Sequence, residues 1–448
     1  MFHLVCFLFL SADPGQATSL LQHGLIALQK NQVMEARSDL EKASQLAPDN
    51  AYVWSSLTEV YLRLQEPRLA ASAAESAEKS GGDNPVVCHA LAMYYSKVGE
   101  PLRAAKFEER FADSPNADAD AWGRAADLYL SGGEAGKALL LAEKAERVHH
   151  SALAENLLGR ALIANGKAGE ASAQLQAAWE SDKTNLQIAF DWGQYLLRKG
   201  EFTRAADVVQ TALDAHPRDA QLTLALGVAR YGQRRFDEAI SEFLKVIRIE
   251  PDIEQPYVFL GRMLDQASAR LPEITGYYEK WLAQNPKNAE AQLLLAKALL
   301  AGHADSERAE ALLRGSIRLK PDNWESHYEL GVLLSGKHSY KEAREELSRS
   351  IALDPKQPMA HYHLARVYDR LGEPDRAKAE REIHSKLTAG RGRGNRDETR
   401  LTGGAYASGS DSALCTKGPL LYSRGSVCSA VCLGGGWADY GYRAACFQ

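Results

Sequence analysis

The amino-acid sequence predicts an all-α solenoid of about eleven helix-turn-helix repeats between residues 17 and 387. The first observation is a proline-centred segment that recurs as LAPDN, AHPRD, IEPDI, QNPKN, LKPDN and LDPKQ. Five of these prolines are separated by 34, 35, 35 and 34 residues, and they lie at positions 217, 251, 286, 321 and 355. A repeat of this length is typical of helical hairpins that stack on their neighbours to bury a continuous core.

Two columns of small residues keep the same period and supply the other two observations. In units counted from Ala17, the eighth residue is glycine or alanine in all but one, where it is Thr58: Gly24, Ala92, Ala126, Gly159, Gly193, Gly227, Gly261, Ala296, Gly331 and Ala365. Alanine recurs twelve residues later, or thirteen in the unit of Ala296, at positions 36, 70, 104, 138, 171, 205, 239, 309, 343 and 377. We expect the two helices of a unit to cross closely at these positions, because large side chains there would force them apart.

Each unit reads, in order, as a helix, a turn, a second helix and a stop. Apolar pairs four residues apart, such as Leu57 with Tyr61, indicate one face of a first helix of about 14 residues. Gly99, Gly200 and Gly372 mark the turn, since glycine accepts the left-handed backbone that ends a helix. A proline then stops the second helix. The Asp or Asn that often follows the proline can cap the next first helix.

These units resemble tetratricopeptide repeats, a family whose pattern places bulky, small and aromatic residues in the first helix, alanines in the second and a proline after it. Unit 51–84 carries this pattern as Trp54, Leu57, Tyr61, Ala70, Ala74 and Ala77, and unit 186–219 as Trp192, Gly193, Leu196, Ala205, Val209, Ala212 and Pro217. The resemblance covers over four fifths of the chain. It implies a right-handed superhelix whose concave groove binds peptides or partner proteins.

Unit 254–288 departs from the pattern. It is one residue longer than its neighbours, and it has no alanine at the second-helix position, where the sequence reads ITGYYEKW. We expect an irregular joint or a wider helix crossing near Tyr277, Tyr278 and Trp281.

The two ends of the chain lie outside the repeats. Residues 1–16 begin with MFHLVCFLFL, which fits either a truncated signal peptide or an apolar segment that packs on the first helix. No Lys or Arg precedes the apolar run, so export to the periplasm and residence in the cytoplasm stay equally open. Residues 388–448 hold 12 glycines and the cysteines at 415, 428, 432 and 446. Their composition favours a disordered tail or an unintended reading frame, with an arginine–glycine arm, a zinc site and disulfides as weaker alternatives.

Charge and hydropathy narrow the classes of partner. The formal net charge is -5 and the pI is near 6.2, which does not favour a nucleic-acid binder. No window reaches the 18 apolar residues of a transmembrane helix. We therefore expect protein or peptide ligands, whereas nothing in the sequence predicts the oligomeric state.

The resemblance also implies which residues face the groove, namely the second, fifth, ninth, twelfth and thirteenth of each unit. Those positions hold cations at 63, 97, 160, 198, 262, 297, 366 and 370, and acids at 59, 120, 127, 265, 290, 325 and 369. Eight cations against seven acids leave no net field to steer a charged ligand. The most distinctive polar and aromatic set is a candidate partner-binding cluster, set against the simpler alternative of solvated surface: Asn156, Arg160, Phe190, Gln194, Arg198 and Tyr231.

Two known specificities of the family are missing from these positions. The fifth and ninth residues of the first unit are Leu21 and Leu25, so the Lys and Asn clamp that chaperone-binding members use for a terminal carboxylate is absent. The sixth positions also lack the asparagine ladder that marks the repeats of sugar-transferase relatives.

Signals of catalysis or metal binding are weak. GGEAGKA at 132–138 lacks the spacing of a phosphate-binding loop and reads as a turn between helices. His361 and His363 lie two apart on an expected helix and would point to different faces, while His149 and His150 lie at a helix end, where histidine favours the helix dipole. Scattered carboxylates such as Glu342 read as solvated helix faces with partners four residues away. We therefore predict no catalytic residues, no cofactor and no metal.

The sequence thus predicts a non-catalytic scaffold or adaptor, with assembly of a complex or of the cell envelope as one setting. Two alternatives stay open. One is a regulatory or targeting subunit of an enzyme, and the other is the repeat region of a sugar-transferase-like protein without its catalytic domain.

Overall fold

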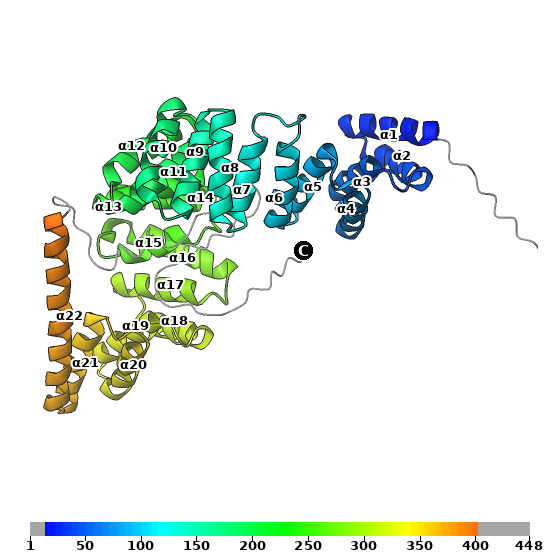
Figure 1. Cartoon of the computed structure of the whole chain (residues 1–448). Helices are drawn as coiled ribbons and strands as arrows, with labels where there is room; N and C mark the ends of the chain where they lie inside the picture. The colour runs from blue at the N-terminus through cyan, green and yellow to red at the C-terminus, as the bar shows by residue number, and fades with distance from the viewer. Residues whose placement is uncertain (1–13, 402–448) are drawn as a thin grey trace, which may run out of the picture. The chain divides into compact units, whose positions relative to one another are not determined.

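The computed structural model describes residues 14–401 of the chain, and the side chains of residues 15–389. Within this range the chain forms 22 α-helices and one short 3₁₀ helix, with no strand (Figure 1). The predicted all-α fold of stacked helical hairpins is confirmed.

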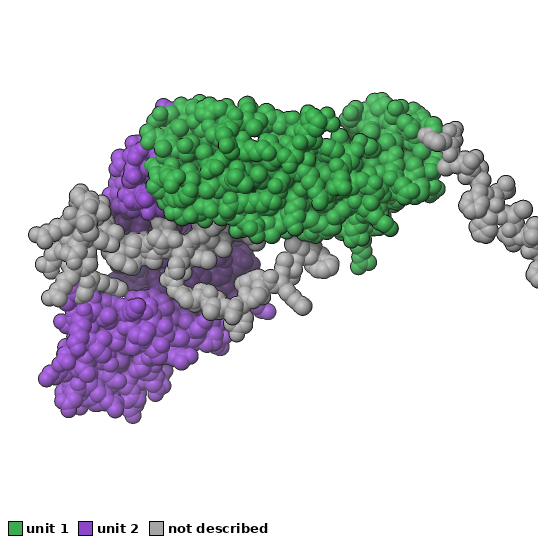
Figure 2. Space-filling model, viewed as in Figure 1, with its two compact units in different colours: residues 1–182 green, residues 183–448 purple. Residues whose placement is uncertain are grey.

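The helices divide between two compact units, residues 1–182 and 183–448 (Figure 2). The described helices of the first unit are α1 Pro14–Gln29, α2 Val33–Leu46, α3 Ala51–Arg63, α4 Pro67–Gly81, α5 Pro85–Lys97, α6 Pro101–Ala112, α7 Ala121–Ser131, α8 Ala135–Val148, α9 Ala152–Ala164 and α10 Ala168–Ser181. Those of the second are α11 Leu186–Lys199, α12 Phe202–Ala215, α13 Ala220–Gly232, α14 Phe236–Ile249, α15 Gln255–Arg262, η1 Ser268–Arg270, α16 Leu271–Gln284, α17 Ala289–Ala301, α18 Ser306–Leu319, α19 Trp324–Gly336, α20 Tyr340–Leu353, α21 Pro358–Leu371 and α22 Pro374–Leu401.

Odd-numbered α-helices are the first helices of the repeats, and even-numbered ones are the second helices. Each first helix contacts the second helix that follows it, and α15 does so through Tyr257, which meets Tyr278 and Trp281 of α16. In the first unit α1 also contacts α3, α3 contacts α5, and α7 contacts α9. In the second unit the same holds for α11 with α13, α15 with α17, and α19 with α21. In these six pairs, successive first helices therefore lie next to one another.

The glycine column marks the closest approach of the two helices in a repeat. A methyl group added at Gly159 would lie 2.6 Å from Leu175 Cγ, and one at Gly227 would lie 2.7 Å from the ring of Phe243. Gly24 meets Leu40 in the same way, and the residue that fills the space lies sixteen positions after the glycine at every glycine of the column except Gly261. Because no Cβ fits at such distances, the expected close crossing is confirmed.

The alanine column is completely buried, from Ala36 to Ala377. From the sequence we expected this alanine to lie directly opposite the glycine, but it does not. The side chain that fills the space above each glycine lies four residues, one helical turn, after the alanine. Alanine at this place lets the second helix approach, while the larger residue one turn later fills the volume that glycine leaves.

The turns between first and second helices share one backbone feature. A single residue with positive φ occurs near every 34th position, in ten of the eleven described turns. Glycine occupies it at 99, 133, 166, 200 and 372, whereas Asn31, Gln65, Arg234, His303 and His338 adopt it without that freedom. The left-handed turn predicted at Gly99, Gly200 and Gly372 is therefore present, and half of the turns form it with other residues.

The proline segments stop one repeat and begin the next, as predicted. Asn50 caps α3 by accepting a hydrogen bond from the amide of Tyr52, and Asn288, Asn323 and Asp219 cap their helices similarly. The proline carbonyl adds a second link, because the side chain six residues later hydrogen-bonds to it. The distances are 2.6 Å for Trp54, 3.0 Å for Tyr257, 3.2 Å for Gln292, 3.0 Å for His327 and 3.1 Å for His361.

The unit at 254–288 has the irregular joint that its sequence predicts. Helix α15 has only 8 residues, and the turns and 3₁₀ segment that follow it take the place of the rest of a first helix. Tyr278 is completely buried and donates a hydrogen bond of 2.8 Å to the carbonyl of Tyr257. Trp281 stacks on the Tyr257 ring at 4.5 Å. Buried Ile274 stands in the register of the missing alanine, and Tyr278 stands one turn later, where other repeats place the large side chain of the core.

The last helix extends beyond the predicted end of the repeats. Helix α22 runs to Leu401, fourteen residues past the expected boundary at 387. The expectations for residues 1–13 and 402–448, a signal peptide and a disordered tail, lie outside the described residues.

Candidate partner-binding surfaces

The first helices carry the positions that the sequence assigns to a groove. We call the side that holds the second, fifth, ninth, twelfth and thirteenth residues of each unit the inner face. Where successive first helices contact one another, as α7 does with α9 and α19 with α21, their inner faces lie side by side.

Two of the six predicted binding residues, Asn156 and Arg160, lie on α9 in the first unit. Asn156 is 2% exposed and so presents almost no surface to a partner. Arg160 is half-buried and pairs at 2.8 Å with Asp127 on the preceding first helix. Arg160 therefore joins neighbouring first helices and keeps part of its guanidinium accessible.

The other four predicted residues lie in the second unit. Phe190, on α11, is 5% exposed and belongs to the core, whereas Gln194 and Arg198 on the same helix are half-buried. Tyr231, near the end of α13, packs its ring against Phe236 and Phe259 at 5.8 and 5.6 Å. The six residues therefore divide between the two units, and their action as one cluster stays a prediction.

The balance of charge on the inner face reflects pairing between its own members. Asp127 binds Arg160, Glu325 binds Lys297, Glu59 binds Arg63, and Asp369 binds Arg381 of the following second helix. These pairs link neighbouring helices or successive turns of one helix. They neutralise part of the charge on the inner face, and the near balance of cations and acids leaves no strong long-range field.

The second unit contains a charged group that the sequence analysis did not single out as a cluster. We call Glu290, Lys297, Glu325 and Glu329, on α17 and α19, the Lys297 cluster. Lys297 Nζ donates to Glu325 Oε1 at 2.5 Å, and both side chains are half-buried. Three carboxyls and one ammonium in a confined place leave negative charge in excess.

The surroundings shift the pKa values of this cluster. Burial, followed by repulsion from Glu325, raises the pKa of Glu290. Burial raises the pKa of Glu329 to about 7, despite the opposing attraction of Lys297. Burial works to lower the pKa of Lys297, but Glu325 and Glu329 outweigh it and raise that pKa. Loss of hydration is thus the main influence here, as expected for carboxyls at a partly closed surface.

Aromatic rings continue the inner face beside this cluster. Tyr328, at the fifth position of its unit, meets His363 edge-on at 5.7 Å, and His363 meets Tyr362 at 5.3 Å. Burial lowers the pKa of His363 and raises that of Tyr328 to about 12, so both are neutral at physiological pH. Neutral rings next to a charged cluster are a combination that suits side chains of a bound peptide.

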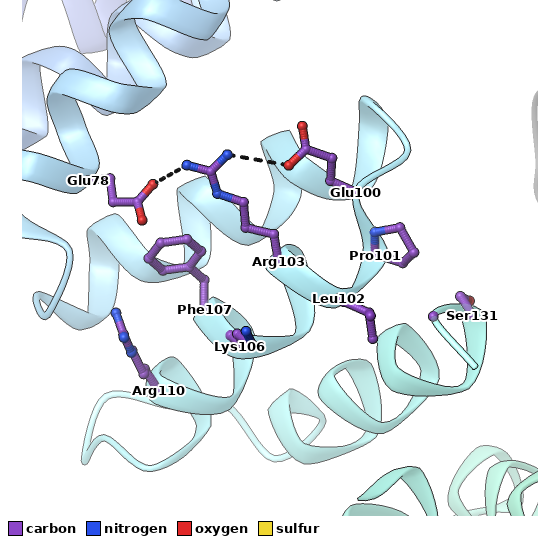
Figure 3. A pocket seen from close by; sticks show the side chains of 10 residues that line it. Glu78, Glu100, Pro101, Leu102, Arg103, Lys106, Phe107, Arg110 and Ser131 are labelled. Atoms are coloured by element: carbon purple, nitrogen blue, oxygen red, sulfur yellow. Dashed lines mark hydrogen bonds and ion pairs between the residues drawn. The ribbon is translucent and has the colours of Figure 1, made fainter. Parts of the chain in front are cut away.

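A separate hollow of about 740 Å³ lies among α4, α6 and the end of α7 in the first unit (Figure 3). Arg103 crosses it and donates to Glu78 at 2.6 Å and to Glu100 at 3.4 Å, while its guanidinium lies over the Tyr95 ring at 4.0 Å. Arg110 donates to the carbonyl of Gly82 at 3.0 Å. These cations link helices of neighbouring repeats, so we interpret the hollow as a packing feature of the second helices.

Several histidines and carboxylates make contacts that cannot be predicted from their positions in the repeat. His361 is buried between Pro355 and Glu380, whereas His363 faces the aromatic rings, so the two point to different surroundings as expected. Glu342 pairs with Arg314 of the preceding second helix instead of a residue four positions away. Glu108 is 2% exposed, between His89 at 2.9 Å and Arg124 at 2.6 Å.

Sequence reasoning missed two buried carboxylates, Glu108 and Glu155, because it treated acids on helices as solvated. Their positions within the repeat could have indicated that they are buried. Glu108 lies sixteen residues after Ala92, where other repeats place the large apolar side chain that faces the small residue. Glu155 lies where other repeats place Trp, Tyr or His beside the proline carbonyl.

Among the described residues, 14–401, no helix combines the length and apolar character that a membrane span requires.

Comparison with known families gives a consistent result. A family model described as tetratricopeptide repeat matches residues 21–85, 190–252, 300–358 and 328–383. These matches fall on repeats in both compact units.

Curated relatives match part of the chain at low identity. Human protein O-mannosyl-transferase TMTC3 is 24% identical over 180 residues, which are 37% of this chain and 20% of the relative. Mouse DnaJ homolog subfamily C member 3 is 23% identical over 232 residues, 48% of this chain and 46% of the relative. The matched regions therefore span between a fifth and about half of the relatives' lengths.

Similar solved structures include yeast Tom70, at 15% identity and a TM-score of 0.39, covering 83% of this chain and 92% of that one. YrrB, described as a TPR protein with an unusual peptide-binding site, has 22% identity and a TM-score of 0.32, covering 41% of this chain and 95% of that one.

Proposed function

The chain is a tetratricopeptide repeat protein, and we propose that it is a non-catalytic scaffold that binds an extended peptide or a segment of a partner protein along its inner face. Its repeats indicate a protein-interaction scaffold. The place of binding and the absence of catalysis are the proposed parts.

One observation carries the proposal, namely the combination of the Lys297 cluster with the rings of Tyr328 and His363. Positions at which the helices of a repeat protein pack together normally hold small or apolar residues, as the glycine and alanine columns show. Here α17, α19 and α21 instead bring ionisable and aromatic side chains to one side, where burial is only partial. Groups that have lost much of their hydration without being enclosed regain contacts when a ligand covers them.

The chemistry of the inner face favours a mixed ligand over a strongly charged one. Several of its cations and acids pair with one another, so a highly charged partner would have to displace existing ion pairs. A peptide that alternates polar and apolar side chains could use the aromatic rings and the exposed edges of the pairs together. Residues Gln194 and Arg198 on α11 would extend the same surface within the second unit.

A second candidate function follows from one comparison, the match to O-mannosyl-transferase TMTC3. In that interpretation the chain is the repeat region of a sugar-transferase-like protein and presents acceptor proteins to a catalytic partner. An assay for mannose transfer by the purified chain tests the absence of catalysis, which both interpretations share. We expect no turnover, and measurable turnover would contradict the non-catalytic proposal.

Partner capture by the full chain tests where binding occurs. We compare the wild type with an inner-face variant, Lys297→Ala with Tyr328→Ala, and with an outer control, Arg204→Ala with Arg235→Ala. Both control residues are exposed. Arg204 lies on α12 and contacts Glu201 and the Trp192 ring, and Arg235 immediately precedes α14 and pairs with Glu238. Circular dichroism establishes that all three are folded to the same extent.

We expect the inner-face variant to lose proteins that the wild type captures and the control to retain them. Loss of the same proteins by both variants, or retention by both, would contradict binding on the inner face of α17 and α19.

A further inference from the structure

The boundary between α8 and α9 differs from the proline boundaries in sequence and in chemistry. The segment VHHSAL keeps the repeat period, but His149 stands in the register of the proline and His150 follows it. Ser151 caps α9 by accepting from the amide of Ala154. The repeat is therefore continuous here, and the two histidines are not needed to stop the helix as proline is.

The residue six positions after His149 also differs from the residues six positions after the prolines. At five proline boundaries this residue contributes an N–H or O–H to the carbonyl of the proline. After His149 the corresponding residue is Glu155, whose carboxylate has only acceptor atoms when ionised. An ionised Glu155 therefore cannot donate a hydrogen bond to the backbone carbonyl of residue 149, as the corresponding residues do to a proline carbonyl. Its carboxylate needs a different partner.

Glu155 has no close partner among the described side chains. Its side chain is 10% exposed, and its polar contacts are long: 3.5 Å from Ser181 Oγ and 3.7 Å from His150 Nε2. A nearly buried carboxylate without a short hydrogen bond is costly, because it has given up hydration for little in return. It is directed toward His150, which lies at the surface.

Glu146 completes the group from the last turns of α8. One of its oxygens hydrogen-bonds to His150 Nδ1, while the other, Oε2, is buried and has no hydrogen-bond partner. Glu146, His150 and Glu155 each offer a ligand atom, and these atoms all lie within 4.8 Å of one another. An imidazole nitrogen and two carboxylates from two successive helices thus converge on one point, with acceptor capacity left unused.

We propose that Glu146, His150 and Glu155 form a binding site for a divalent transition-metal cation of the zinc class. Imidazole nitrogen with carboxylate oxygen is a ligand set that Zn²⁺ and similar ions accept, and three protein ligands leave a position for water. The cation would satisfy Glu146 Oε2 and Glu155 together, and it would join the end of α8 to the start of α9. The sequence pattern predicts no metal here, because two histidines at a helix end also favour the helix dipole.

An imidazole must be neutral to bind a metal, so a proton and a metal compete for His150. The site should therefore bind metal more tightly as pH rises. His150 is exposed, which gives a metal direct access from solvent.

Cobalt titration of the metal-free full chain tests the site, because Co²⁺ replaces Zn²⁺ and absorbs visible light. The variants are His150→Ala and Glu155→Gln, and the matched control is His149→Ala, which removes the neighbouring exposed histidine. Cysteine thiolates are also ligands for such ions, and the chain has six cysteines. Their thiolates give a charge-transfer band that an imidazole–carboxylate site lacks, so the two kinds of binding are distinguished in one spectrum.

We expect the wild type and His149→Ala to bind a cobalt ion without that band, and His150→Ala and Glu155→Gln to bind it at least about tenfold more weakly. Zn²⁺ should raise the unfolding midpoint of the first pair and not of the second. Since His150 is exposed, its replacement leaves the fold intact, which circular dichroism verifies. Equal cobalt affinity in the wild type and His150→Ala would overturn the proposal. Glu146, His150 and Glu155 would then interact only with one another.

Discussion

Two neighbouring repeats of the second unit, α13 with α14 and α15 with α16, solve the same packing problem differently. In the first, Gly227 admits the ring of Phe243, and α13 has 13 residues. In the second, no alanine is available, α15 has 8 residues, and Tyr278 and Trp281 fill the space. A repeat can therefore lose its close helix crossing and keep a dry core, provided that larger side chains replace the backbone contact.

The comparison of these two repeats also shows how the column of small residues acts in the regular ones. Small residues allow backbones to approach, and the volume is filled by one large side chain from the opposite helix. The irregular repeat depends instead on stacked rings and on one buried hydroxyl, which hydrogen-bonds to the carbonyl of Tyr257. We therefore expect it to respond differently to truncation and to added volume.

The largest effect should come from Trp281→Ala in the irregular repeat. Trp281 is 2% exposed and stacks on Tyr257, so its removal leaves a cavity between short elements. We expect a loss of about 3–5 kcal/mol in the free energy of unfolding of this region, measured by urea denaturation. A loss below about 1 kcal/mol, within the usual range for surface sites, would mean that the aromatic cluster does not hold this joint.

Added volume should damage the regular repeat more selectively. Gly227→Ala brings a methyl group into the Phe243 ring, and we expect destabilisation of about 1–3 kcal/mol. The double change Gly227→Ala with Phe243→Leu should recover part of that loss, because the smaller side chain yields space. An equal or greater loss in the double variant, measured in the same denaturation experiment, would contradict the proposed pairing.

The inner face next to the irregular repeat should show a pH dependence that comes from Glu329. Its pKa of about 7 lies above the ordinary 4.5, so the folded chain holds this proton more tightly than the unfolded chain. The free energy of unfolding therefore decreases as pH rises from about 4.5 through 7, and Glu329 is destabilising above that range.

Glu329→Gln should remove this dependence. We expect the variant to exceed the wild type by about 1–2 kcal/mol above pH 7, less than the full shift implies because the side chain keeps some contact with water. The two should be equal near pH 4.5. Parallel stability curves for the two proteins across this range would contradict the assignment.

The smallest effects belong to the turns, where regular repeats differ among themselves. Gly200 and His338 both have positive φ, but only glycine adopts it without strain. We expect Gly200→Ala to lower the unfolding free energy by about 1 kcal/mol and His338→Gly to leave it unchanged or to raise it by a few tenths. Thermal melts of the two variants compare them directly, and a destabilised His338→Gly would show that its side-chain contact with Tyr340 outweighs the backbone strain.

Much of the fold could be predicted from the sequence because its signals repeat. Gly24, Gly159 and Gly331 each meet a large residue at the same spacing, so one physical requirement is written many times. The irregular joint was predictable for the same reason, as a place where the pattern fails. The extent of α22 was not, since a helix without a neighbouring repeat keeps no period.

The candidate surfaces were predicted less completely, since position in a repeat does not determine exposure. Asn156 and Phe190 both occupy the fifth position and are buried, whereas Tyr328 at the same position is half-buried. The fifth position lies between adjacent first helices, and the size of its neighbours decides what reaches solvent. Glu155 was missed because its burial depends on the register of one boundary and not on the composition around it.

Hydrogen exchange on the full chain, with and without a captured partner, tests the central claim most directly. Binding along the inner face predicts slowed amide exchange in first helices α17, α19 and α21, with little change in second helices α16, α18 and α20. Protection confined to the second helices would contradict the account.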